Sequence, residues 1–277
     1  PEAAAKDSSG ELTLKVAADD SAAASVSINS AQAALGYEVE VVGLDTANTT
    51  PVKVELKVGA GLTNVVLYHN GSPMIKGTGA DSLTDGQYFY NESTGILTFA
   101  TSKFSPFAVV YDAPTAVIGD TYYDTLADAV AAAKDGDTIT LLGDAELTET
   151  LNITKAITLD GANHKITGKP STGETSFITV ITDGSFTMAN ATILPTSKVE
   201  KNSAIDLQVK GKVVVDNCVF GAADDANQFM YNGLEFSQSR DYPMADGTTI
   251  SNCTFYGGSF RHNFISFYRM AEGATIN

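Results

Sequence analysis

The chain lacks tryptophan altogether and has only two cysteines among its 277 residues. No apolar run approaches the roughly 18 residues that a membrane-spanning helix requires, so the sequence predicts no membrane insertion. Basic residues are also scarce, because 17 lysines and arginines stand against 33 acidic residues and give a net charge of −16. Such a charge repels the phosphate backbone of nucleic acids and anionic lipid surfaces, which excludes nucleic acid as a partner.

Small residues, most of them polar, are abundant in the chain, in contrast to tryptophan, cysteine and the basic residues. Threonine, serine, asparagine, glycine and alanine are abundant, and long charged side chains are few. This composition is typical of exported bacterial proteins. It predicts an extracellular location, on the cell surface or secreted.

The first part of the chain reads as short strands. Residues 1–10, "PEAAAKDSSG", are interpreted as a linker, or as the end of a preceding element, that stops at a Ser-Ser-Gly breaker. Residues 11–113 alternate apolar and polar positions between turns rich in glycine and asparagine, which predicts an antiparallel β-sandwich. A short helix is expected from Ser30 to Leu35. The closing segment "YNESTGILTFATSKFSPFAVVYDAP" resembles the Ig-like modules of large bacterial surface proteins.

The second part combines one helix with a repeat. Thr125 and Asp128 form a capping-box-like start, Leu126 and Val130 follow at helical spacing, and Gly136 ends the helix. Four similar segments then end at asparagines separated by 27, 35 and 25 residues: Asn190, Asn217, Asn252 and Asn277. Repeats of this length, built from short strands with glycine and asparagine at the corners, are typical of solenoids with one coil per repeat.

Three stretches carry a resemblance to a known family. "YDTLADAVAAAKDGDTITLL", "LNITKAITLDGANHKITG" and "TISNCTF" resemble the pectate-lyase-like β-helices of bacterial surface proteins. The predicted fold is therefore all-β, with an N-terminal Ig-like β-sandwich followed over 114–277 by a right-handed parallel β-helix with an N-terminal capping helix. The repeat stops at a corner, so we expect a C-terminally incomplete solenoid that can self-associate through its end or its sheet edges.

The two cysteines follow asparagines in matching segments, "VVVDNCVF" and "TTISNCTF". The asparagines are expected to stack as a ladder of amide hydrogen bonds at buried corners. Cys218 and Cys253 then stack about 4.8 Å apart. Either two buried thiols or a disulfide fits this spacing, although parallel side chains suit the disulfide poorly. Two such ligands without a histidine make a zinc site a poor match.

Aligned coils also predict which residues face outward. The alignment places two apolar stacks inside the solenoid: Ile178, Ile205, Leu234 and Ile265, then Val180, Leu207, Phe236 and Phe267. Thr179, Asp206, Glu235 and Ser266 lie between them and are expected to face solvent in a column. Asp206 and Glu235 could hold Ca²⁺ or share a proton as an acid/base pair. The alternative is two solvated carboxylates on an acidic protein.

The arginines are confined to the end of the chain. Arg240, Arg261 and Arg269 are the three arginines, and Tyr242 and Tyr268 lie beside two of them. Arginine on carboxylates and tyrosine on sugar faces would build a polysaccharide-binding groove. The alternative is that these arginines neutralise the surrounding acidic residues.

Two functions follow from these observations. The first is a non-catalytic surface or secreted protein, an adhesin or surface-assembly component, whose β-helix displays a face to a glycan or a host ligand. The second is a polysaccharide lyase or glycoside hydrolase that acts on an acidic polysaccharide over the face of Asp206 and Glu235. In that case Arg261 or Arg269 would serve as the base and calcium would acidify the substrate.

Overall fold

The protein was analysed as a computed structural model that describes residues 3–7, 10–42, 49–104, 106–168, 176–196, 203–224, 230–236 and 241–268. Strands dominate these residues, so the all-β prediction holds at that level. The chain divides into two compact units, Pro1–Ala113 and Pro114–Asn277. Within the described part, no helix has the length and hydropathy needed to cross a membrane.

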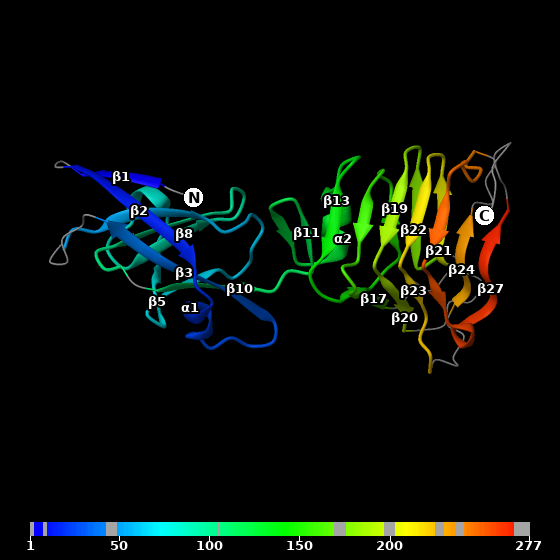
Figure 1. Cartoon of the computed structure of the whole chain (residues 1–277), viewed down its shortest axis with the longest axis horizontal. Helices are drawn as coiled ribbons and strands as arrows, with labels where there is room; N and C mark the ends of the chain where they lie inside the picture. The colour runs from blue at the N-terminus through cyan, green and yellow to red at the C-terminus, as the bar shows by residue number, and fades with distance from the viewer. Residues whose placement is uncertain are drawn as a thin grey trace. The chain divides into compact units, whose positions relative to one another are not determined.

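The first unit contains two sheets among its described residues (Figure 1). The larger sheet has the strand order β1 (Ala3–Asp7), β2 (Gly10–Ala18), β3 (Gln32–Val42), β10 (Phe107–Asp112), β5 (Val66–His69) and β6 (Ser72–Pro73). The smaller has the order β4 (Val52–Lys57), β9 (Ile96–Thr101), β8 (Gln87–Asn91) and β7 (Ile75–Lys76). Phe99 of β9 and Phe107 of β10 are fully buried with ring centroids 4.7 Å apart, so the two sheets pack against each other.

Two local predictions for this unit are wrong. Residues 3–7, expected in a linker, form β1 and pair with β2. The helix expected from Ser30 to Leu35 is instead α1 (Asp20–Ala24), capped by the Asp19 carboxylate. Ala33 and Ala34 instead lie in β3 and pair with β10. The start of α1 packs on β3 at Gly36, where an added Cβ would lie 1.8 Å from the backbone oxygen of Asp19.

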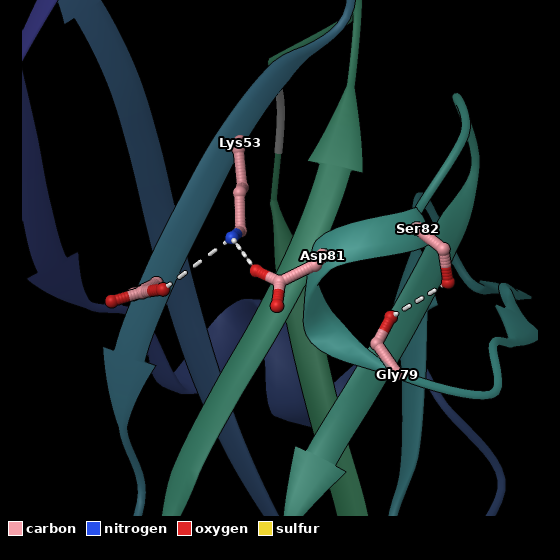
Figure 2. A network of polar contacts seen from close by, with 5 residues as sticks. Lys53, Gly79, Asp81 and Ser82 are labelled. Carbon is pink, nitrogen blue, oxygen red and sulfur yellow. Dashed lines mark hydrogen bonds and ion pairs between the residues drawn. The ribbon is translucent and has the colours of Figure 1, made fainter.

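A surface network spans the smaller sheet of this unit (Figure 2). The Lys53 ammonium of β4 lies 3.6 Å from the Asp81 carboxylate of the 3₁₀ turn η1 (Ala80–Ser82) and 3.9 Å from Glu55. The Ser82 hydroxyl donates to the Gly79 carbonyl at 3.4 Å. These groups are exposed, so each contact contributes at most about 1 kcal/mol.

The second unit is built from three sheets that the chain visits in turn (Figure 1). Their described strands, in sheet order, are as follows. The first sheet has β12 (Thr121–Tyr123), β11 (Ala116–Ile118), β13 (Thr138–Leu141), β16 (Thr158–Asp160), β19 (Phe186–Ala189), β22 (Val213–Asp216) and β25 (Thr249–Ser251). The second has β14 (Ala145–Leu147), β17 (Lys165–Gly168), β20 (Thr192–Pro195), β23 (Val219–Phe220) and β26 (Thr254–Phe255). The third has β15 (Leu151–Ile153), β18 (Ile178–Thr182), β21 (Ser203–Val209), β24 (Met230–Phe236) and β27 (Phe260–Phe267).

β13 pairs with β11 in antiparallel fashion, whereas the described coils from β13 to β27 pair with one another in parallel, and each coil gives one strand to each sheet. Both predicted apolar stacks are confirmed by the register of β18, β21, β24 and β27. Their members from Ile178 to Phe236 are at most 2% exposed. Alternating inward residues therefore build one continuous apolar core along the coils.

The predicted helix at the start of this unit is confirmed as α2 (Leu126–Ala132). The Thr125 hydroxyl oxygen accepts from the Asp128 amide at 3.1 Å, and the hydroxyl donates to the Asp128 carboxylate at 2.6 Å. Leu126, Ala129 and Val130 are buried in the same core as the coils. The helix thus covers the first layer of that core.

Candidate functional site

The predicted column of outward residues forms on the third sheet of the second unit. Thr179 pairs with Asp206, Asp206 with Glu235, and Glu235 with Ser266 in the parallel register. Asp206 and Glu235 are half-buried, as is Thr179. Ser266 was expected to face solvent and is buried instead, and its hydroxyl oxygen accepts from the Asn263 amide at 3.1 Å.

A second polar column lies three residues before the first. Ser203 pairs with Asn232, and Asn232 pairs with Asn263. The Asn232 amide donates to Glu235 Oε2 at 3.0 Å, and the Ser203 hydroxyl donates to the same oxygen. Asn263 repeats this i to i+3 contact with Ser266. Ser203 and Asn232 are essentially inaccessible to solvent, so they hold Glu235 in a fixed orientation.

Asp206 lies in a different environment from Glu235. The Gln208 amide donates to its Oδ2 at 3.0 Å. Burial raises the pKa of Asp206 above its usual value, and the neighbouring Glu235 charge raises it further. The pair therefore combines a carboxylate fixed by two donors with one whose ionised form is disfavoured.

Aromatic side chains lie next to the carboxylates. Tyr231 of β24 stacks on His262 of β27 with ring centroids 4.7 Å apart. Tyr268 directly follows β27 and is 54% exposed. Partial burial raises the pKa of Tyr268, and the charges of Glu235 and Tyr231 raise it further. The face thus has exposed aromatic surface beside its acceptors.

The other predicted site residues are distributed differently. Arg261 is exposed on β27. The ring centroid of Tyr242 lies 5.2 Å from the Lys210 ammonium, which is paired with Asp183 at 2.8 Å. Arg240 and Arg269 lie outside the described residues. Nothing in the structure therefore tests their predicted roles.

The predicted calcium site gains little support from its ligands. Ca²⁺ requires six to eight oxygen ligands, several of them usually carboxylates. Over the residues that the structure describes, no group of three or more His, Cys, Asp or Glu side chains could hold a metal ion. Asp206 and Glu235 would have to bind calcium as a pair of carboxylates, with neutral oxygens or water completing the shell.

The predicted asparagine ladder forms only in part, because Asn217 bonds to its neighbour Asn190 whereas Asn190 and Asn252 donate to aspartates. The corners are not buried as expected, since Asn217 and Asn252 are exposed and Asn190 is half-buried. Asn190, Asn217 and Asn252 all adopt left-handed backbone, with φ of 53°, 52° and 53°. Asn190 donates to Asp160 at 2.9 Å and Asn252 donates to Asp216 at 2.8 Å. Each acceptor lies one coil back, at the position before the corner. Asn217 finds Ala189 at that position and donates to the Asn190 side-chain oxygen instead, at 2.8 Å.

The cysteines are two free thiols, as one of the two predicted alternatives required. Cys218 is buried, whereas Cys253 is partly exposed. The interaction between the two thiols, together with burial, raises the pKa of Cys218, and the same interaction lowers the pKa of Cys253 to about 7.

Sequence reasoning missed Ser203, Asn232 and Gln208, although a signal was present. A polar residue precedes each column member by three positions in three successive coils, as Ser203–Asp206, Asn232–Glu235 and Asn263–Ser266.

Comparison with known proteins adds no assignment, because no family model, no curated protein and no solved structure matches the chain.

Proposed function

We propose that the second unit is a right-handed parallel β-helix and the first an Ig-like β-sandwich. Three parallel sheets visited in turn by successive coils support the first assignment. Two packed sheets with mainly antiparallel pairing support the second. Together they support the resemblance to modular bacterial surface proteins with pectate-lyase-like domains.

On this basis we propose a non-catalytic surface or secreted protein, an adhesin or surface-assembly component, whose third sheet binds a glycan. The observation that carries the proposal is the double polar column, in which Ser203 and Asn232 orient Glu235 beside Asp206 on a half-exposed sheet. Carboxylates and amides fixed in this way accept and donate hydrogen bonds to sugar hydroxyls. Exposed Tyr268 supplies a ring for a sugar face.

The charge of the face favours a neutral glycan. Two carboxylates, those of Asp206 and Glu235, would face the ligand, and the whole chain carries a net charge of −16. Both charges would repel a polymer rich in uronates. Among the described residues, Arg261 is the one arginine, and it is exposed on β27. An acidic polysaccharide is therefore the less favoured ligand.

One observation favours the enzymatic alternative. The raised pKa of Asp206 beside the oriented Glu235 is the arrangement of a general acid next to a carboxylate. Neighbouring parallel strands are about 4.8 Å apart, close to the roughly 5 Å between the carboxyl groups of retaining glycosidases. A glycoside hydrolase is thus the second candidate function.

Affinity electrophoresis through gels containing neutral β-glucan, xylan or mannan tests the proposal, with polygalacturonate and alginate as acidic comparisons. We expect retardation by at least one neutral polymer and its loss in Tyr268→Ala and Asp206→Asn. The matched control is Ile75→Ala, which removes a 66%-exposed apolar side chain from the first unit and should change nothing. No retardation by any neutral polymer would refute the proposal. Release of reducing sugars or unsaturated products would establish the enzymatic alternative.

A further inference from the structure

Cys218 and Cys253 occupy equivalent positions in neighbouring coils. Asp216 lies opposite Ser251, and Val219 lies opposite Thr254, in two successive sheets. The two cysteines between these pairs are therefore opposite each other as well. Neighbouring parallel strands are about 4.8 Å apart, and the two thiols form no disulfide.

Both sulfurs point into the apolar core at the same depth of their coils. Cys218 donates to the Asp216 carbonyl at 3.3 Å, and Cys253 makes the equivalent contact with the Ser251 carbonyl at 3.1 Å. Cys218 is a member of the buried core, and Cys253 packs against it while remaining partly exposed. The pair thus combines an apolar shell with a route to solvent through Cys253.

The preceding coil shows that this position does not need sulfur for packing. Ala191 follows Asn190 as the cysteines follow their asparagines, and it is buried at 2% exposure. The Val219 amide bonds to the Ala191 carbonyl, and the Thr254 amide bonds to the Cys218 carbonyl in the same way. An alanine therefore fits the position, and the two thiols add a chemical property that the fold itself does not require.

We propose that Cys218 and Cys253 form a two-coordinate site for a soft monovalent cation, with Cu(I) as the ion that it takes. Soft thiolate ligands favour Cu(I), zinc and iron–sulfur clusters. With a metal–sulfur bond near the roughly 2.3 Å that thiolates make to zinc, a linear S–metal–S unit spans about 4.6 Å, close to the strand spacing of about 4.8 Å. Zinc fits poorly because it takes four ligands, and no group of three metal-ligating side chains occurs among the described residues.

Binding requires no redox step. One Cu(I) replaces the two thiol protons, forming two copper–sulfur bonds and releasing two protons to water. The copper remains Cu(I) throughout, so neither an oxidant nor a reductant is needed. The product is a dithiolate complex with a net charge of −1.

Anaerobic competition between the 277-residue chain and a chromophoric Cu(I) chelator tests the site. We expect one Cu(I) bound per chain, and at least a tenfold loss of affinity in both Cys218→Ala and Cys253→Ala, which install the residue found at position 191. Met244→Leu removes a different buried sulfur and is the matched control, expected to bind as the wild type does.

X-ray absorption of the copper-loaded wild type provides a second measurement that does not depend on the folding of the variants. Two sulfur neighbours in a linear arrangement are expected. A wild type that cannot compete with the chelator, a cysteine variant that keeps wild-type affinity, or a copper shell dominated by nitrogen or oxygen would each overturn the proposal.

Discussion

Replacing Asn217 tests why asparagine stands at the coil corners. Its φ of 52° is left-handed, which costs an ordinary L-residue about 1–2 kcal/mol but is well tolerated by asparagine and glycine. Its side chain also donates to Asn190, a neutral hydrogen bond worth about 0.5–1.5 kcal/mol. Because Asn217 is exposed, the lower half of that range applies. Asn217→Ala loses both contributions and should lower the free energy of unfolding by about 2 kcal/mol.

Asn217→Gly separates the two contributions. Glycine keeps the left-handed backbone but loses the amide contact and adds freedom to the unfolded chain, which costs roughly 0.5–1 kcal/mol. We therefore expect a loss of about 1–2 kcal/mol, smaller than the loss for alanine. Urea unfolding followed by circular dichroism measures both variants on the transition of the second unit. An alanine variant as stable as the glycine variant, or as the wild type, would refute the argument from backbone conformation.

Two further predictions concern the second unit. Burial raises the pKa of Asp206, so its ionised form disfavours the folded state at pH 7, and this penalty disappears below the unfolded pKa of about 3.9. Asp206→Asn should therefore raise the free energy of unfolding at pH 7 and give a shrinking gain toward pH 4; a gain independent of pH in urea titrations would contradict this. Ala189→Asn should give the second N–H of the Asn217 amide an acceptor beside Asn190 and stabilise the unit by about 0.5–1 kcal/mol. Ala189→Asp is the comparison, and it should be less stable because the new carboxylate would lie between Asp160 and Asp216. An Asp variant more stable than the Asn variant at low salt would contradict this expectation.

The register of the third sheet could be predicted because its signal is periodic. Inward residues recur every second position and the corners align successive coils, so Asp206 falls opposite Glu235 without structural information. The helix expected after Ser30 had no such constraint. The alanines of this segment are compatible with a helix as well as with a strand. The segment forms a strand because β3 pairs with β10, which is distant in the sequence.

The support of the carboxylates could not be predicted from alternation alone. By alternation, Ser203 and Asn232 share the parity of the inward apolar residues and would be assigned to the core. In the structure they are buried as expected, yet their polar groups reach Glu235 across the strand. A buried amide must find a partner, so an inward Asn three residues before an outward Glu was the available signal.

The acceptors of the corner ladder follow from charge as well as geometry. Asp160, Ala189 and Asp216 occupy one column, because Asp160 pairs with Ala189 and Ala189 with Asp216. An aspartate at position 189 would stand between two others at a spacing of about 4.8 Å, and like charges directly opposite are destabilising. Asp160 and Asp216 each accept an amide from the next coil, and hydrogen bonds from Ser251 and then Asn252 lower the pKa of Asp216. Ala189 places no charge between these two carboxylates. Because its side chain offers no acceptor, the Asn217 amide bonds to the neutral side-chain oxygen of Asn190.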